Sequence, residues 1–191
     1  MAPIRKSRPA AAAVLGGYPI TLTGMMGVGK TTVGRNLAFI LDRRFIDSDN
    51  EIERSAGMPI ADIFAQYGEP EFRDLELRVV RRLADQDQVV ISTGGGAFIA
   101  PQTRRVMLSK THVVCLTSTI DDIVGRLSRT NNRPMLRDDL RASLRDLMRS
   151  REALYRLAHM TFESSDAQTP KILARTIAAA LAQVCVQPSP P

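Results

Sequence analysis

The fold is decided by one stretch of sequence, PITLTGMMGVGKTT at residues 19–32. Residues 19–23 are apolar and β-branched, which predicts a buried strand, and residues 30–41 have the hydrophobic period of a helix. Between them, Gly24 and the run Gly29-Lys30-Thr31 have the spacing of a phosphate-binding loop. The motif also has the preceding strand and following helix that it requires. The sequence therefore predicts a nucleoside triphosphate site where the first strand ends.

Each residue type in this loop has a chemical task. Glycines let backbone N–H groups turn toward a phosphate, and the start of the helix supplies further N–H donors. We expect Lys30 to reach the β- and γ-phosphates, Thr31 to coordinate Mg²⁺ and Thr32 to contact the α-phosphate. The ATP-binding residues predicted in the loop are Gly27, Val28, Gly29, Lys30, Thr31 and Thr32.

The rest of the chain alternates short apolar runs with longer helical patterns, which is typical of βαβ units around a parallel sheet. Further strands are predicted at residues 45–47, 89–93, 113–116 and 160–162, and helices at 60–67, 71–84, 120–127, 140–158 and 170–184. A turn is expected at 68–70 and a loop at 129–138, where the apolar period is lost. We therefore expect one α/β domain over residues 19–185, with a central five-stranded parallel sheet flanked by helices.

Composition narrows the class of protein. The 191 residues contain no apolar run of eighteen or more, so no membrane span is predicted. The net charge of +6 is compatible with nucleic-acid binding, but the arginines between Arg126 and Arg156 are interleaved with acidic residues. That interleaving favours solvated helix faces and small anionic ligands over a nucleic-acid tract.

The cysteines of the chain favour the reducing cytoplasm as its compartment. Cys115 and Cys185 lack the spacing of a zinc site or a disulfide framework, and Cys115 is expected to be a small buried hydrophobe. Residues 1–18 are rich in Ala, Arg and Pro, and they and the tail 186–191 are predicted to be disordered. No apolar stripe is left over for an interface, so a monomer is expected.

Acidic residues follow the second predicted strand, in the run Phe45-Ile46-Asp47-Ser48-Asp49. Strand alternation would put Asp47 and Asp49 on one side, at the edge where open α/β sheets bind ligands. Alternatively, these residues cap a helix that runs through Ile52. The residues alone leave both interpretations open.

Several ordered segments together resemble shikimate kinases. The resemblance covers residues 20–179 and is carried by the phosphate loop, by Phe45–Asp49, by Ile60–Phe64 with Glu71–Glu76, and by Gly94-Gly95-Gly96. The segments Arg133-Pro134-Met135-Leu136 and Arg151–Tyr155 add to it. It implies a three-layer P-loop kinase fold with a mobile lid at about 129–138. It also implies transfer of the γ-phosphate of ATP to the 3-hydroxyl of shikimate, with Mg²⁺ as cofactor, in aromatic amino acid biosynthesis.

The resemblance assigns roles to particular residues. Asp49 would accept the proton of the attacking hydroxyl, and Asp47 would hold Mg²⁺ together with Thr31. The shikimate-binding set would be Asp49, Phe64, Phe72, Arg73, Gly95, Gly96 and Arg151. Arg133 on the lid would stabilise the transferred phosphoryl group, and Arg126 and Gln168 would lie near the adenine. At Gln168 some members of the family carry arginine.

Plainer interpretations of the same residues stay open. Without the resemblance, Arg73 is best interpreted as a helix-surface ion pair with Glu69 or Glu76. The glycine run can be a simple turn, and Phe64 and Phe72 can be core residues.

Two other functions also stay open. One is a P-loop kinase for gluconate or a nucleoside monophosphate, which the acceptor-side residues named above argue against. The other is a nucleotide-binding module that has lost catalysis, which the intact phosphate loop and acidic residues argue against. Neither His112 nor His159 falls in a matched segment, so transfer without a phosphoenzyme is expected.

Overall fold

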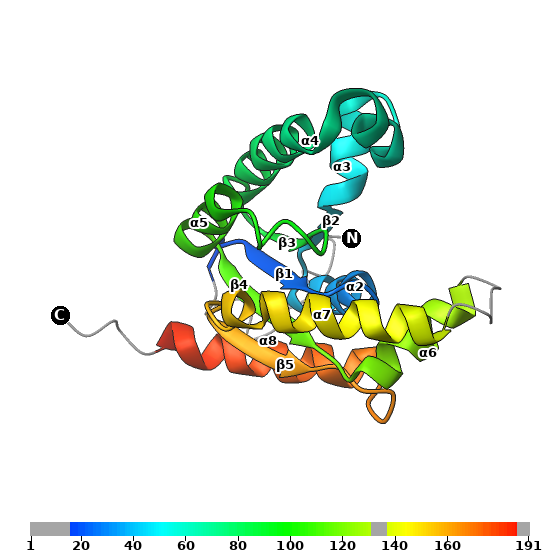
Figure 1. Cartoon of the computed structure of the whole chain (residues 1–191). Helices are drawn as coiled ribbons and strands as arrows, with labels where there is room; N and C mark the ends of the chain where they lie inside the picture. The colour runs from blue at the N-terminus through cyan, green and yellow to red at the C-terminus, as the bar shows by residue number, and fades with distance from the viewer. Residues whose placement is uncertain (1–15, 131–136, 187–191) are drawn as a thin grey trace, which may run out of the picture.

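Five parallel strands form the sheet at the centre of the computed structural model, which describes residues 16–130 and 137–186 (Figure 1). The strands are β1 (Ile20–Gly24), β2 (Arg44–Asp47), β3 (Val89–Ser92), β4 (His112–Thr117) and β5 (Met160–Glu163), in the order β2-β3-β1-β4-β5. Every neighbouring pair is parallel. The carboxyl ends of all the strands therefore meet at one edge, which confirms the predicted fold class.

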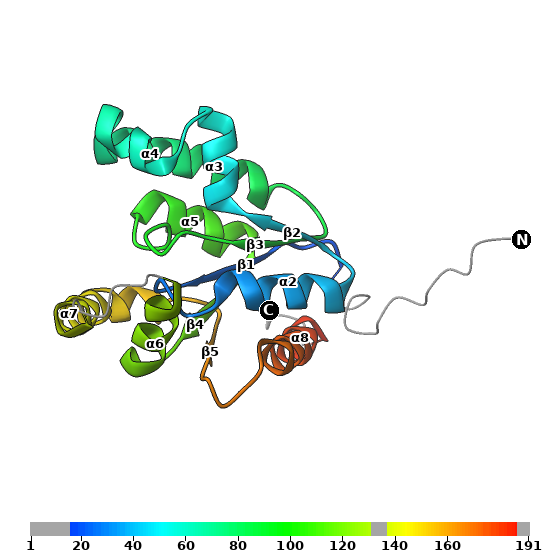
Figure 2. The ribbon, with the colours of Figure 1, turned by 90° about the vertical axis from the view of Figure 1, so that its right-hand side faces the viewer.

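Helices cover both faces of this sheet. Figure 2 shows α2 (Lys30–Leu41) and α8 (Pro170–Val186) side by side on one face, and α5 (Pro101–Lys110), α6 (Ile120–Thr130) and α7 (Arg137–Tyr155) on the other. Two more helices, α3 (Ser48–Ala56) and α4 (Ile60–Ala84), project from the β2 side. None of the helices in the described ranges has the length and apolarity to cross a membrane.

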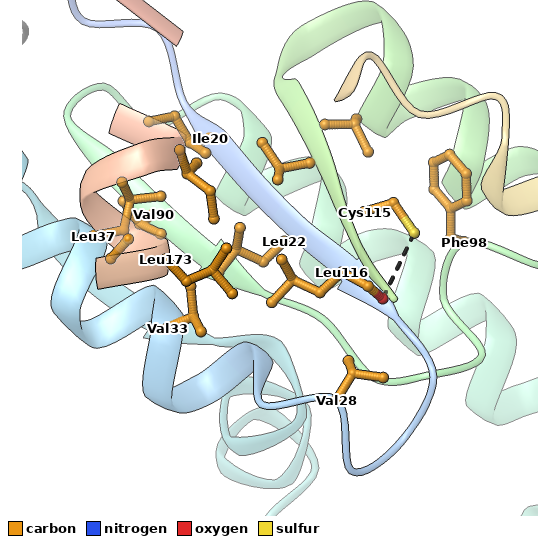
Figure 3. Close-up of a cluster of buried hydrophobic side chains, with 14 of the residues drawn as sticks. Ile20, Leu22, Val28, Val33, Leu37, Val90, Phe98, Cys115, Leu116 and Leu173 are labelled. Atoms are coloured by element: carbon orange, nitrogen blue, oxygen red, sulfur yellow. Dashed lines mark hydrogen bonds between the residues drawn. The ribbon is translucent and has the colours of Figure 1, made fainter. Parts of the chain in front are cut away.

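The core is built around β1, all of whose residues are buried. Ile20 and Leu22 pack with Leu37 of α2 and Leu173 of α8 (Figure 3). Burial of one such side chain contributes about 1.5–3 kcal/mol. Cys115 on β4 is fully buried, and its thiol donates to the Leu116 carbonyl oxygen at 3.8 Å, which confirms it as a small core residue. This packing fixes the end of β1, where the phosphate loop begins.

The helices differ from the predicted ones at several points. Helix α5 was not predicted, because only Thr103 and Met107 of its ten residues are buried and the helical period is weak. Helices α6 and α7 extend into both ends of the predicted loop at 129–138, and α7 ends at Tyr155 rather than at residue 158. The turn predicted at 68–70 is a break within α4, where Gly68 has φ 78° and ψ 178°.

The N-terminal boundary of the domain lies earlier than predicted. The Gln88 N–H donates to the Gly17 carbonyl at 2.8 Å, and the buried Arg43 guanidinium donates to the carbonyls of Gly16, at 3.0 Å, and Tyr18. These hydrogen bonds connect residues 16–18 to the domain. The rest of the predicted extension, the tail 187–191 and Arg133 lie outside the described residues.

Candidate active site

The phosphate loop joins β1 to α2 through backbone that only glycine adopts easily. Gly24, Gly27 and Gly29 have φ values of 133°, 75° and 93°. A Cβ on Gly24 would lie 2.2 Å from the Leu116 carbonyl oxygen, so no side chain fits there. Gly29 is the N-cap of α2 and has no side-chain cap. The first N–H groups of α2 are therefore available for an anion, and the helix dipole favours negative charge there.

Lys30 lies in the first turn of α2 with its ammonium group buried beneath the loop. Its Nζ donates to the carbonyl oxygens of Gly24 at 2.9 Å and Met25 at 2.8 Å. Burial lowers the pKa of Lys30 to about 8, against the opposing effect of the Asp49 and Asp47 charges. An anion bound in the loop would favour the charged form of this lysine.

Three side-chain oxygens lie together where β2 and β3 end beside the loop. Thr31 Oγ1 donates to Asp47 Oδ2 at 3.1 Å and is 3.5 Å from Ser92 Oγ. The other carboxylate oxygen of Asp47 accepts the Asp49 N–H at 3.1 Å and caps α3. Asp47 therefore caps α3, as the capping interpretation predicts, and it also lies at the carboxyl end of β2 in contact with Thr31 of the loop helix. The alternation argument for Asp49 was wrong, because this residue lies in the first turn of α3 and not on a strand.

Hydroxyl and carboxylate oxygens of this kind suit Mg²⁺, which is commonly held by one or two protein groups together with substrate phosphates. Within residues 16–130 and 137–186 there is no group of three or more His, Cys, Asp or Glu side chains that could hold a metal alone. The residues present therefore fit an ion that arrives with phosphate rather than one in an all-protein cage.

Asp49 approaches the glycine turn that follows β3. Its Oδ1 would lie 2.6 Å from a Cβ on Gly94, so a side chain there would collide with the carboxylate. Burial, and next the charge of Asp47, raise the pKa of Asp49, while Lys30 lowers it. A carboxyl whose pKa is raised in this way is suited to accept a proton.

The next two glycines connect Asp49 with the other predicted acceptor residues. A Cβ on Gly96 would lie 2.8 Å from a guanidinium nitrogen of Arg73. The Gly95 carbonyl oxygen accepts hydrogen bonds from Arg151 Nη1 at 3.2 Å and from the Tyr155 hydroxyl at 2.8 Å. Residues from α3, α4 and α7 thus meet around one turn, although they are far apart in sequence.

The guanidinium of Arg73 is held by two glutamates of α4. It contacts Glu69 Oε1 at 3.0 Å and Glu76 Oε2 at 2.9 Å. The surface-pair interpretation holds only for Glu69, because the side chain of Glu76 is just 1% exposed. Burial raises the pKa of Glu76, and its hydrogen bond and ion pair with Arg73 lower it. An arginine fixed in this way can present its remaining donors to a carboxylate.

The Phe72 ring lies 5.1 Å from the Arg73 guanidinium carbon and packs against Phe64, and the two aromatic side chains differ in burial. The rings of Phe64 and Phe72 are 4.5 Å apart. Phe72 is a core residue at 5% exposure, as the core interpretation predicts, whereas Phe64 is 39% exposed. Phe64 therefore offers an apolar surface, with Phe72 behind it.

A hollow of about 540 Å³ lies beside the phosphate loop and is lined in part by Gly29 of that loop. Its lining includes the predicted residues Thr32, Arg126 and Gln168, from α2, α6 and the segment between β5 and α8. Arg126 joins these parts, because its guanidinium contacts Asp166 at 2.9 Å and the Gly27 carbonyl at 3.3 Å. The hollow could accept the nucleoside end of a nucleotide whose phosphates lie in the loop.

Sequence reasoning missed several residues of this site: Ser92, Tyr155, Ser164 and Asp166. Tyr155 lies in a segment that carried the family resemblance, so only its role was missed. Ser92 ends a strand beside the glycine run, and Asp166 lies in a polar segment. Neither position belongs to a local sequence pattern that indicates binding or catalysis.

Comparisons with known proteins agree with this geometry. The family model described as shikimate kinase matches residues 26–182. A shikimate kinase of Novosphingobium aromaticivorans is 49% identical over 87% of this chain and 89% of its own length. One from Rhodopseudomonas palustris is 42% identical over 94% and 89%. The structure of the Acinetobacter baumannii shikimate kinase in complex with shikimate has a TM-score of 0.83 and 37% identity, covering 93% of this chain and 99% of that one.

The family match spans the phosphate loop from Met26 onward, the acidic residues that follow β2, the glycine turn and the nucleotide-side hollow. Its members are ATP-dependent kinases that act on an alcohol group, which agrees with a phosphate site beside the half-buried carboxylate of Asp49. This chain belongs to the shikimate kinase family.

Proposed function

We propose that this protein transfers the γ-phosphate of ATP to the 3-hydroxyl of shikimate, giving shikimate 3-phosphate and ADP. One observation carries the proposal. The half-buried carboxylate of Asp49 lies between a phosphate loop that contains Lys30 and a turn that is approached by Arg73 and Arg151. A phosphate donor and an acidic polyol can therefore meet at one carboxylate.

The phosphate loop binds the donor in this proposal. N–H groups of the loop and of α2 surround the β-phosphate, and Lys30 neutralises charge that develops on the β- and γ-phosphates. Thr31 and Asp47 would hold Mg²⁺, which would supply further charge neutralisation to the phosphates. On the nucleoside side, Thr32 contacts the α-phosphate, and Arg126 and Gln168 contact the adenine.

Asp49 acts on the acceptor. It accepts a hydrogen bond from the acceptor hydroxyl and takes its proton as the oxygen attacks the γ-phosphorus. The bond from phosphorus to the bridging oxygen of ADP breaks, and ADP leaves with that electron pair. The transfer is direct and in line, so no phosphoenzyme forms. The Arg133 guanidinium stabilises the charge on the transferring group.

The remaining residues recognise shikimate. Arg73 and Arg151 bind its carboxylate, because a guanidinium offers two parallel donors to a carboxylate. The N–H groups of Gly95 and Gly96 bind its polar edge, and Phe64, backed by Phe72, packs against the carbocycle.

An acceptor comparison tests the proposal. ADP release would be measured with Mg²⁺-ATP and either shikimate, gluconate or a nucleoside monophosphate. We expect strong stimulation by shikimate alone. A clear preference for another acceptor would refute the choice of substrate, and ATP binding without turnover would identify a non-catalytic module.

The carboxylate assignment has its own test in the same assay. Arg151→Ala should raise the KM for shikimate much more than the KM for ATP. The control, Arg149→Ala, changes an exposed arginine on the same helix and should leave both constants unchanged. Equal losses for both substrates in Arg151→Ala would refute the role of this residue.

We also propose that the protein acts as a monomer in the cytoplasm. The thiol of Cys115 is free and buried, which suits a reducing compartment. The exposed large apolar side chains of the described residues are spread over several parts of the protein, for example Phe39 on α2, Leu157 after α7 and Ile172 on α8. This distribution favours a monomer. Light scattering on the purified protein would measure the mass, and a dimer mass would refute the monomer.

A further inference from the structure

The hydroxyl of Tyr155 links the last turn of α7 to the glycine turn of the acceptor site. It donates to the Gly95 carbonyl oxygen at 2.8 Å, across 60 residues of sequence. The side chain is only 7% exposed, and its ring stacks on that of Phe98 with centroids 6.2 Å apart and planes 5° apart. Burial raises the pKa of Tyr155, so the hydroxyl keeps its proton and remains a donor.

This hydrogen bond controls the direction of a neighbouring N–H group. The Gly95 carbonyl and the Gly96 N–H belong to one planar trans peptide unit, so they point in opposite directions. Fixing the carbonyl toward α7 therefore aims the Gly96 N–H away from α7. In the described part of the chain neither the Gly95 N–H nor the Gly96 N–H has a hydrogen-bond acceptor. Both are available to a ligand, on a turn that already approaches Asp49 and Arg73.

A glycine turn needs such a restraint, because glycine backbone moves between conformations at low cost. Arg151, one helical turn before Tyr155, donates to the same Gly95 carbonyl at 3.2 Å, so the two side chains share one anchor. On the other side of the turn, Arg104 donates to the carbonyls of Phe98 at 3.0 Å and Ile99 at 2.8 Å. The turn is thus held from both α5 and α7.

We propose that Tyr155 is a positioning residue for the acceptor site. Its hydroxyl fixes the Gly95 peptide, which aims the Gly96 N–H at the acceptor and gives the Arg151 guanidinium a fixed partner. Tyr155 itself does not touch the substrate. The inference rests on the proposed function and extends it by a residue whose contacts are all to protein groups.

The test compares two tyrosine-to-phenylalanine variants. Tyr155→Phe keeps the ring and its stacking on Phe98 and removes only the hydroxyl. The matched control is Tyr18→Phe, which also loses one hydrogen bond to a backbone carbonyl, that of Ser109 at 3.1 Å. Tyr18 precedes β1, at the opposite end of the sheet from the site. The Kd for shikimate would be measured by calorimetry, and KM, kcat and Tm alongside it.

We expect Tyr155→Phe to raise the Kd and the KM for shikimate by about three- to tenfold, the usual effect of one hydrogen bond. The KM for ATP and kcat should change by less than about twofold, because the phosphate loop keeps its contacts. In Tyr18→Phe none of these constants should change.

Two outcomes would overturn the inference while the proposed function stands. One is a Tyr155→Phe protein with unchanged affinity for shikimate. The other is a Tyr155→Phe protein that loses affinity for shikimate and ATP equally and has a lower Tm, which would show a merely structural role. A wild-type protein that neither binds nor phosphorylates shikimate would refute both proposals. Measuring the wild-type protein alongside the variants therefore separates a failure of the proposed function from a failure of this inference.

Discussion

Lys30 combines a positive charge with a buried position, and this has a measurable consequence. Because its pKa is about 8, part of the population is neutral at alkaline pH, whereas bound phosphates favour the charged form. ATP binding should therefore take up protons above about pH 8, and ATP affinity should fall by up to tenfold per pH unit there. Calorimetry in buffers of different ionisation heat, at about pH 7.5 and pH 9, would measure this uptake. Equal proton uptake at pH 7.5 and pH 9 would contradict the lowered pKa of Lys30.

Asp49 is expected to set the acidic limb of the pH–activity profile. Burial and the charge of Asp47 raise its pKa, so activity should be lost at a pH above that expected for an ordinary aspartate. Asp49→Asn should lower kcat by about 10²–10⁴-fold, the usual contribution of a general base. Asp74→Asn, which changes an exposed aspartate paired with Arg78, is the control and should leave kcat unchanged. An Asp49→Asn enzyme with normal kcat would refute the role of Asp49.

At the scale of elements, the turn after β3 brings the helices of the acceptor site together. A Cβ on Gly96 would lie 2.8 Å from Arg73, so Gly96→Ala should displace the guanidinium from its position between Glu69 and Glu76. We expect a rise of at least about tenfold in the KM for shikimate with little change for ATP, since a displaced charge-assisted pair costs about 1.5–3 kcal/mol. Steady-state kinetics would measure both constants.

The control for that variant is Gly125→Ala. Gly125 lies within α6, and a Cβ there meets nothing within 4 Å. This substitution should leave both KM values unchanged and stabilise the helix by about 0.5–1 kcal/mol. If Gly96→Ala behaved like Gly125→Ala, the close approach of Arg73 to the turn would have no role in substrate binding.

Local sequence patterns predicted most elements and much of the site, but not the contacts between elements. The phosphate loop was readable because its glycines, lysine and flanking elements are consecutive in sequence. The opposite holds for Tyr155, whose partner is the backbone carbonyl of a glycine 60 residues away. Helix α5 was missed because it buries few apolar residues. The roles of Arg73 and Arg151 came from the family resemblance, since a single arginine on a helix has no local signal for a substrate.

At the scale of the whole molecule, three basic side chains lie near the amino ends of β2, β4 and β5, opposite the site: Arg43, His112 and His159. His159 Nδ1 accepts the Val113 N–H at 3.0 Å, so this histidine must be neutral to keep the bond. Burial lowers the pKa values of both His112 and His159, and the charges of His159 and Arg43 lower that of His112 further. The native state therefore prefers neutral histidines.

This preference fixes the sign of the pH dependence of stability. The folded-state pKa values lie below the unfolded value of about 6.5, so the stabilisation is complete above about pH 6.5. It is lost as the pH falls through 6.5 toward the folded values. Urea unfolding at pH 7.5 and 5.5 should show lower stability at the acidic pH, and His112→Gln should reduce the difference. A protein that is more stable at pH 5.5 than at pH 7.5 would contradict this account.

The whole molecule brings one phosphate loop and one acceptor turn to the same edge of the sheet, so the account requires direct transfer between two bound substrates. The most direct measurement is product analysis by ³¹P NMR after mixing the protein with Mg²⁺-ATP and shikimate. We predict one shikimate 3-phosphate for each ADP, with no accumulation of inorganic phosphate and no phosphoprotein. ADP formed together with inorganic phosphate, at a rate independent of shikimate, would contradict the account.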